Sequence, residues 1–176
     1  MVQSNLMRYL IFFLFFVYSI QAYSQKHNVP TTSAIEVKGM VKKSLLLSID
    51  KLSGFRQDSL GDVIIRNKHG EQKSISKQLK GILLKSIIDS AGIIVDKPKE
   101  YSEIGIILTA SDGYKNVYSW NELFNTEIGN HVYVITQADG LPIAEMPDKI
   151  LVLSLADINS GARHLKGLAT IEIKKM

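Results

Sequence analysis

The sequence predicts an α+β domain built on a mixed, mostly antiparallel sheet with two main helices. At least six β-favouring runs stand against two clear helical segments, and turns, not regularly alternating helices, connect the runs. Two of these turns contain Asp-Gly, at Asp112-Gly113 and at Asp139-Gly140. Asp-Gly between two β-favouring runs is typical of a hairpin, and hairpins place neighbouring strands antiparallel.

The first 24 residues are typical of a signal peptide. A short segment ending at Arg8 is followed by the apolar run Tyr9 to Ile20 and by Ala22-Tyr23-Ser24, a small-x-small cleavage pattern. The apolar run is shorter than the about 20 residues that a membrane-spanning helix needs. We therefore expect export, cleavage after Ser24, a periplasmic or secreted location and no stable membrane span afterwards. An uncleaved N-terminal anchor is the alternative.

The rest of the chain has the size and charge of one ordinary domain. Without residues 1–24, it has 20 Lys and Arg against 17 Asp and Glu, a formal charge of +3. The basic residues are scattered, which favours a solvated surface over a nucleic-acid-binding stripe. The chain has no cysteine, so its stability must come from burial and not from disulfides. We expect a flexible lead-in over residues 25–33 and a single domain over residues 34–176.

Alternation and capping predict the first elements of that domain. Ile35 and Val37 lie on one side of a run over residues 34–41 with charged residues between them, which indicates a half-buried strand. Ser48 is placed to cap a short helical turn over residues 49–53. Further predicted strands are residues 63–65, 132–135, 150–155 and 169–174.

The clearest predicted helix covers residues 79–91. Its apolar residues recur at helical spacing, and Gly92 stands where a helix-ending glycine belongs. These apolar residues are Leu79, Leu83, Leu84, Ile87, Ile88 and Ala91.

The central stretch predicts a hairpin that runs into a second helix. Residues 104–110 and 115–119 are two β-favouring runs on either side of Asp112-Gly113. Ser119 and Glu122 then have the spacing of a capping box, in which each side chain accepts from the other residue's backbone N–H. We expect strand, turn, strand and helix start in that order.

Few side chains have the spacing of a catalytic or metal site. The four histidines occur singly, and neither a nucleophile elbow nor a phosphate-binding glycine loop is present. Asp139, Glu145 and Asp148 suit either an acid–base pair or a hard-cation site, or simply cap turns. Arg163, His164 and Lys166 suit either a phosphate or carboxylate ligand, or an exposed basic turn.

Taken together, these segments resemble the molybdopterin-binding domain of the sulfite-oxidase-type oxidoreductases. The resemblance extends over roughly Ile35 to Ile173 and depends on the order and spacing of several short motifs. In chain order they are residues 35–39 (IEVKG), 80–84 (KGILL) with 89–93 (DSAGI), 111–114 (SDGY), 139–143 (DGLPI), 161–168 (GARHLKGL) and 171–173 (IEI).

The resemblance implies that fold and molybdopterin as the cofactor. In the family, the Arg and Lys of the motif matched by residues 161–168 bind the cofactor phosphate, which implies this role for Arg163 and Lys166. A guanidinium fork and an ammonium beside glycines suit a phosphate. His164 from the same motif, with Asp112 and Tyr114 from the SDGY motif, are the further candidate cofactor-binding residues. No catalytic or metal-binding residue is predicted.

One departure from the family pattern decides the expected function. The family's enzymes hold molybdenum through a cysteine thiolate, whereas this chain has no cysteine and reads Ile64-Ile65-Arg66-Asn67 in the corresponding region. We expect an exported, non-redox ligand-binding or accessory module whose partner is a small ligand or an envelope protein. Two alternatives stay open: a molybdopterin-dependent oxidoreductase that uses the cofactor's dithiolene alone, and a structural protein-interaction domain.

Overall fold

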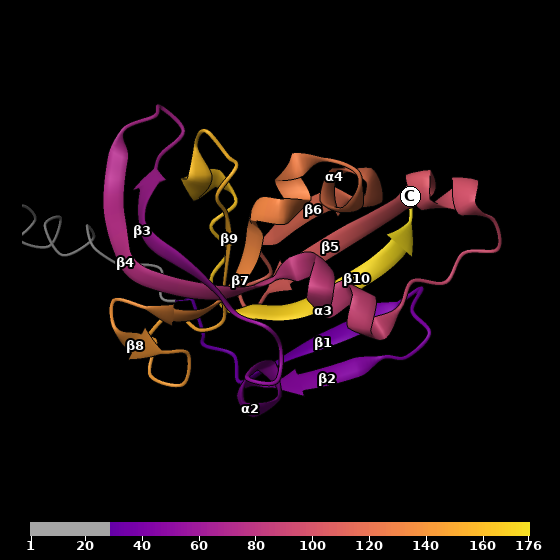
Figure 1. Ribbon diagram of the computed structural model, residues 1–176, viewed down its shortest axis with the longest axis horizontal. Coiled ribbons are helices and arrows are strands. Elements are labelled where there is room, and N and C mark those ends of the chain that lie inside the picture. Colours follow the sequence, from indigo (N-terminus) through magenta and orange to yellow (C-terminus); the bar gives the residue numbers. More distant parts are fainter. Residues whose placement is uncertain (1–28) are drawn as a thin grey trace, which may run out of the picture.

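The structure is a computed structural model that describes residues 29–176, in which two sheets enclose one core (Figure 1). The signal peptide expected over residues 1–24 lies outside the described residues. All strand pairs are antiparallel except β1 with β10, which is parallel. The α+β class and the mostly antiparallel pairing are therefore as predicted, but the strands form two sheets and not one.

The first sheet has five strands, in the order β2-β1-β10-β5-β6. Ile35 and Val37 on β1, like Ile171 on β10, are completely buried, which confirms the alternation predicted for these strands. The strands are β2 (Leu45–Ser48), β1 (Ala34–Gly39), β10 (Leu168–Lys175), β5 (Ile104–Ala110) and β6 (Lys115–Ser119).

The second sheet has the order β3-β4-β7-β8, and β9 also pairs with β7. Only Lys80 to Leu83 of β4 pair with β7, so the rest of the β3–β4 hairpin projects beyond the other strands (Figure 1). The strands are β3 (Asp58–Arg66), β4 (Gln72–Leu83), β7 (Val132–Ala138), β8 (Leu141–Pro142) and β9 (Leu151–Ser154).

The helix predicted from Leu79 begins only at Leu84, as α3 (Leu84–Ala91). Residues up to Leu83 belong to β4 instead, because Ile82 pairs with Val134 of β7. Pairing on both edges of a strand overrides a local helical spacing. The predicted end of the helix is confirmed, since Gly92 caps α3 with φ +67°.

The other α-helices within residues 29–176 are short and begin at predicted caps. In α4 (Trp120–Phe124), Ser119 Oγ accepts from Glu122 N at 3.0 Å. In α2 (Ile49–Leu52), Ser48 accepts from Lys51 N. Three 3₁₀ segments complete the described elements: η1 (Pro98–Glu103), η2 (Glu127–His131) and η3 (Ser160–Ala162). No helix in the described part of the chain is long and apolar enough to cross a membrane.

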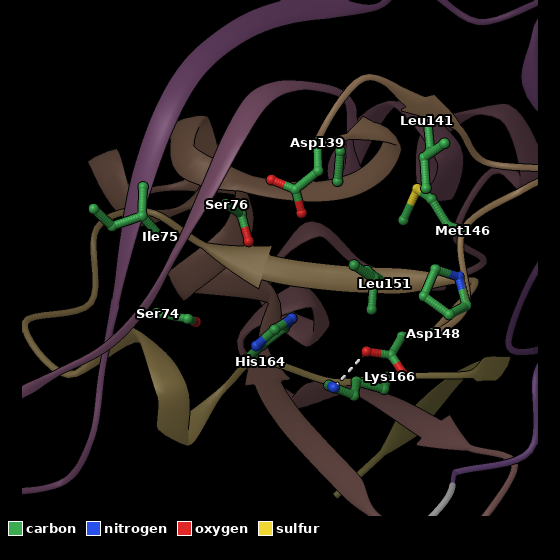
Figure 2. Close-up of a pocket in the computed structure, with 12 residues that line it drawn as sticks. Ser74, Ile75, Ser76, Asp139, Leu141, Met146, Asp148, Leu151, His164 and Lys166 are labelled. Atoms are coloured by element: carbon green, nitrogen blue, oxygen red, sulfur yellow. Dashed lines mark hydrogen bonds and ion pairs between the residues drawn. The ribbon is translucent and has the colours of Figure 1, made fainter.

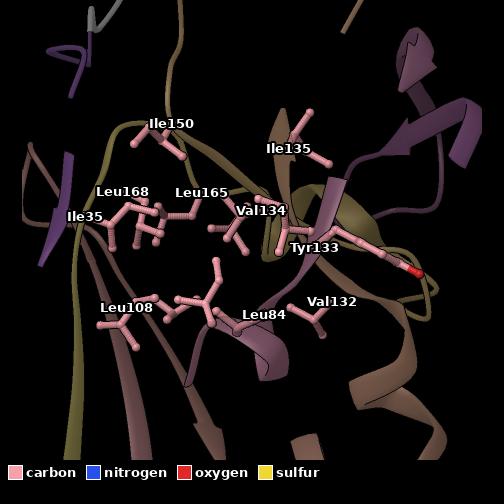
Figure 3. Close-up of a cluster of buried hydrophobic side chains, with 14 of the residues drawn as sticks. Ile35, Leu84, Leu108, Val132, Tyr133, Val134, Ile135, Ile150, Leu165 and Leu168 are labelled. Atoms are coloured by element: carbon pink, nitrogen blue, oxygen red, sulfur yellow. The ribbon is translucent and has the colours of Figure 1, made fainter. Parts of the chain in front are cut away.

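Aliphatic side chains from both sheets and from α3 fill the core (Figure 3). Burial of this apolar surface is the main stabilising contribution in a chain without disulfides. Residues 29–33, the described part of the expected lead-in, are hydrogen-bonded to the folded domain. Thr32 Oγ1 donates to Leu168 O at 2.8 Å and accepts from Ile150 N at 3.2 Å. Residues 29–33 therefore lead directly onto β1.

Candidate functional site

A cleft of about 280 Å³ lies beside the part of β4 that extends past β7 (Figure 2). It is here called the β4 cleft. Its apolar lining includes Leu141, Met146 and Leu151. Its polar lining comes from the β4 hydroxyls, two carboxylates and the segment after η3. These polar residues are Ser74, Ser76, Asp139, Asp148, His164 and Lys166.

A second cleft, of about 260 Å³, lies next to it and is here called the Tyr114 cleft. It is lined by Val29, Asp112, Tyr114, Gly161, His164 and Lys166. His164 and Lys166 line both clefts. The structure thus brings together four of the five residues expected to bind a ligand. The fifth, Arg163, lines neither cleft.

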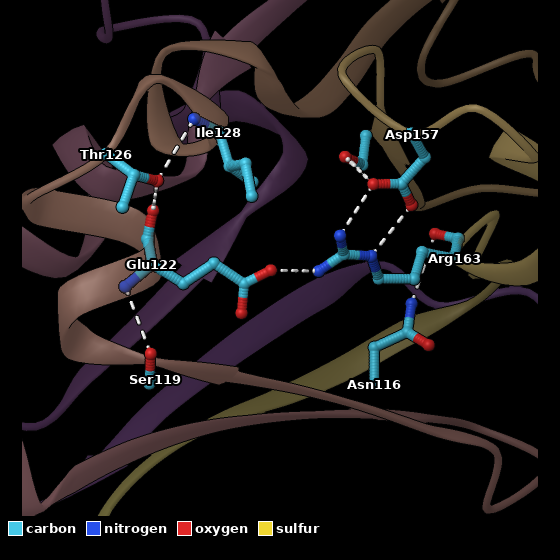
Figure 4. Close-up of polar contacts among 8 residues, drawn as sticks. Asn116, Ser119, Glu122, Thr126, Ile128, Asp157 and Arg163 are labelled. Carbon is cyan, nitrogen blue, oxygen red and sulfur yellow. Dashed lines mark hydrogen bonds and ion pairs between the residues drawn. The ribbon is translucent and has the colours of Figure 1, made fainter.

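Arg163 is instead held by two carboxylates (Figure 4). Its Nε and Nη2 donate to the two oxygens of Asp157 at 2.7 and 2.6 Å, and its Nη1 donates to Glu122 Oε1 at 2.5 Å. The guanidinium also lies 4.6 Å from the ring centroid of Tyr118. Hydrogen bonds to Asp157 raise the pKa of Arg163 further above its usual range. The residue acts as a clamp between separate segments.

The same contact changes the predicted capping box. Ser119 caps α4 as expected, but the Glu122 carboxylate binds Arg163 and does not return to the Ser119 backbone. A charge-assisted hydrogen bond to a guanidinium is stronger than a bond to a neutral amide. Of the two hydrogen bonds predicted for the capping box, only the one accepted by Ser119 Oγ is therefore formed.

Lys166 and His164, which line both clefts, have different charge states. Lys166 Nζ forms an ion pair with Asp148 Oδ2, and both side chains are partly exposed. The pKa of His164 is lowered to about 4, mainly by burial and also by the positive charges of Lys166 and Lys73, while Asp148 opposes the shift. His164 is therefore a neutral hydrogen-bonding group at pH 7.

The β5–β6 turn is fastened to the segment that carries these residues. Tyr114 Oη donates to Ala162 O at 2.8 Å, and Asp112 Oδ1 accepts from Tyr114 N at 2.9 Å. Ser111 N donates to Gly167 O at 2.8 Å. A β-carbon on Gly167 would lie 2.6 Å from Pro30 O, so this close approach requires glycine.

The three carboxylates between residues 139 and 148 have different surroundings, although Asp139 and Asp148 both line the β4 cleft. Asp139, at φ +53°, forms the β7–β8 turn and accepts from Lys77 N at 2.8 Å, while Asp148 binds Lys166. Glu145 is exposed and lines neither cleft. Within residues 29–176, no three His, Asp or Glu side chains gather as a metal site would need. Turn formation is the role that the structure gives to Asp139.

The hydroxyls of Ser74 and Ser76 had no signal in the sequence. They line the β4 cleft because β4 continues past β7, and this extension depends on pairing with β3 (Ile65 with Ser74, Val63 with Ser76). No short motif in the polar run around them marks such a position.

No known family model and no curated protein matches the sequence. A solved structure does: the sulfane dehydrogenase SoxCD from Paracoccus pantotrophus, with a TM-score of 0.60 and 11% sequence identity. This chain is similar in fold to that enzyme. The match covers 85% of this chain but only 40% of the SoxCD chain. At this identity the likeness concerns the fold alone, and this chain spans less than half of the larger protein.

Proposed function

We propose that this chain is an exported, non-redox binding module with the fold of the sulfite-oxidase-type molybdopterin-binding domain. Its ligand occupies the β4 and Tyr114 clefts, where His164 and Lys166 contact it. The observation that carries this proposal is that His164 and Lys166 line both clefts, while Arg163 binds Asp157 and Glu122.

The size and lining of the clefts support binding of a small organic molecule. Their volumes of about 280 and 260 Å³ are each close to the lower end of the range for ligand pockets, which is roughly 300–1,000 Å³. Such pockets combine apolar walls with a few polar groups that orient the ligand. Here Leu141, Met146 and Leu151 supply apolar surface, and Ser74 and Ser76 supply hydroxyls.

The residues that would hold molybdopterin do not fit that cofactor. A phosphate needs uncompensated cationic donors, but the Arg163 guanidinium already binds two carboxylates and Lys166 binds Asp148. The family's metal ligand is a thiolate, and the chain has no cysteine. A phosphate at this site would have to compete with three carboxylates. These features favour a binding role over oxo-transfer chemistry.

Native mass spectrometry of the protein purified from its own host tests this proposal. We expect a co-purifying small molecule in the wild type, and its loss in Leu141→Trp, because the larger side chain fills the β4 cleft. Leu46→Trp is the matched control, since Leu46 is 64% exposed on β2 and lines neither cleft. Absence of any bound molecule, or equal retention in both variants, would refute the proposal.

A further inference from the structure

The cleft side of β4 has an unpaired backbone edge. β7 pairs with β4 only from Lys80 to Leu83. Next to this pairing, Lys77 N donates to Asp139 Oδ1 at 2.8 Å, and Asp139 N donates to Lys77 O at 2.7 Å. The chain then turns away from β4 into β8. Among the strands described, none therefore lies beside the cleft edge of β4 over residues 72–76.

The backbone groups of Ile75 face this edge. Alternate residues of a strand direct their N–H and C=O groups to opposite edges. On β3, Arg66 N donates to Ser160 Oγ at 3.2 Å and Ile64 O accepts from Ser160 Oγ at 3.3 Å, both on the outer edge of the hairpin. Ile64 lies directly opposite Ile75, so the two residues form a pair without mutual hydrogen bonds. Ile75 therefore directs its N–H and C=O toward the cleft, as Lys77 does two residues later.

These two groups of Ile75 are unsatisfied in the described part of the chain. Neither of them has a hydrogen-bond partner within residues 29–176. Elsewhere the hairpin edges are covered, by Ser160 on the outer edge and by Asp139 at Lys77. A strand edge with a free N–H and C=O is a template for another strand. One residue of an extended chain can bond to both groups at once.

The side chains along this edge alternate between two faces (Figure 2). The Ile75 side chain points away from the cleft and is 44% exposed, whereas Ser74 and Ser76 lie on the cleft side of β4. Ile64, opposite Ile75, is 40% exposed. A residue paired with Ile75 would place its side chain on the face of these two isoleucines, which favours an apolar residue there. Its neighbours would face the apolar lining of the cleft.

We infer that the β4 cleft binds a short peptide in extended conformation, which adds to β4 as a strand beside Ile75. This inference rests on the proposed function and names the ligand class of the same site. Backbone pairing supplies affinity in this mode of recognition, and alternate side chains supply selectivity. Asp139 closes one end of the edge and the β3–β4 turn closes the other. Residues 72–76 extend over about 16 Å at roughly 3.3 Å per residue, so about five peptide residues can pair.

Two peptides that differ only in their backbone test this pairing. The probe is acetyl-Thr-Val-Val-Val-Thr-amide, and its matched control is the same peptide N-methylated at the second and third residues, which blocks both edges of the extended peptide. Hydrogen exchange of the ¹⁵N-labelled protein purified from its own host, measured by NMR, reports single backbone amides. We expect saturating probe to slow exchange of the Ile75 amide about tenfold, the equivalent of one hydrogen bond. The N-methylated peptide should leave it unchanged.

Ile75→Pro removes the N–H that the peptide needs without removing a hydrogen bond to β3. Proline is tolerated at such an edge position. We expect the probe to bind this variant about tenfold more weakly, measured by calorimetric titration. Ile64→Pro is the matched control, because it replaces the opposite isoleucine and removes an N–H from the outer edge of the same hairpin. Circular dichroism checks the fold of both variants, and the comparison of the two peptides on the wild type needs neither.

Each outcome bears on the inference separately from the proposed function. Unchanged exchange at Ile75 with the probe, equal binding of the two peptides, or equal losses in the two variants would overturn the inference. So would a concentration-dependent dimer that Ile75→Pro abolishes, because a second copy would then occupy the edge. The binding module stands in these cases if a molecule still co-purifies and is lost in Leu141→Trp. Absence of any co-purifying molecule refutes the proposed function instead.

Discussion

Arg163 and Asp157 form a two-bond ion pair, with Nε 2.7 Å from Oδ2 and Nη2 2.6 Å from Oδ1. Because Arg163 also binds Glu122 on α4, it connects the end of the first sheet to the loop that follows β9. Asn116 of β6 adds a hydrogen bond to the Arg163 carbonyl at 3.1 Å. This arrangement makes Arg163 a clamp between segments.

Replacement of this arginine should therefore lower the stability of the fold. Arg163→Ala leaves Asp157 and Glu122 without their cation, and we expect the free energy of unfolding to fall by about 2 kcal/mol. This is less than for a fully buried pair, because the Arg163 side chain is 25% exposed. Urea unfolding followed by circular dichroism measures the change.

Arg56→Ala provides the matched control for this measurement. The Arg56 side chain is 91% exposed and lies 3.3 Å from Asp58, so we expect a change below about 0.5 kcal/mol. If the two variants lose the same stability, Arg163 is not a clamp.

The stability of the fold should be sensitive to substitution of Gly167, because its neighbours leave little room for a side chain. A β-carbon there would lie 2.6 Å from Pro30 O and 2.7 Å from Ser111 Oγ, at φ +65°. We expect Gly167→Ala to cost about 3 kcal/mol of unfolding free energy, because it adds a clash to an unfavourable backbone conformation. Thermal or urea unfolding of the purified variant provides the measurement.

Gly61→Ala separates the clash from the backbone effect. Gly61 has a similar φ of +70°, but an added β-carbon would meet nothing within 4 Å. The expected cost is about 1–2 kcal/mol. If the Gly167 variant is at least as stable as the Gly61 variant, then the segment before Ser33 does not pack closely against Gly167.

His164 should make stability depend on pH in acid. Its pKa falls from an ordinary 6.5 to about 4 in the folded protein, so between these values the unfolded chain binds a proton that the folded chain does not. The free energy of unfolding should therefore decrease as the pH falls from about 6.5 to 4, by on the order of 2 kcal/mol, and be fully retained above that window.

Unfolding curves at a series of pH values for His164→Gln test this dependence. The variant should lose less stability than the wild type across the window, whereas His69→Gln, on the exposed turn after β3, should follow the wild type. Parallel loss in all three proteins would mean that other groups cause the acid sensitivity.

Local signals predicted the elements whose geometry is itself local. The β5–β6 hairpin follows from Asp112-Gly113 and the two runs beside it, and the start of α4 follows from Ser119. The β7–β8 turn has positive φ at both Asp139 and Gly140, as an Asp-Gly hairpin turn allows. In these places the residues that make the structure are within a few positions of one another.

Features that depend on distant residues were missed. The helical spacing from Leu79 predicted a helix, but the first of these residues belong to β4, which pairs with β7 more than fifty residues later in the chain. The bond from Arg163 to Glu122 joins residues 41 apart, so no local pattern in the sequence showed that Arg163 would connect these segments. The grouping of Asp112 and Tyr114 with His164 and Lys166 came from the family resemblance alone, and the structure places all four at one cleft.

Metal and pterin analysis of the protein purified from its own host tests the central claim most directly. Inductively coupled plasma mass spectrometry measures molybdenum per chain, and fluorescence after acid release measures bound pterin. A non-redox module without a thiolate ligand, in which carboxylates already hold Arg163 and Lys166, should contain neither in stoichiometric amount. One molybdenum and one pterin per chain would contradict the claim.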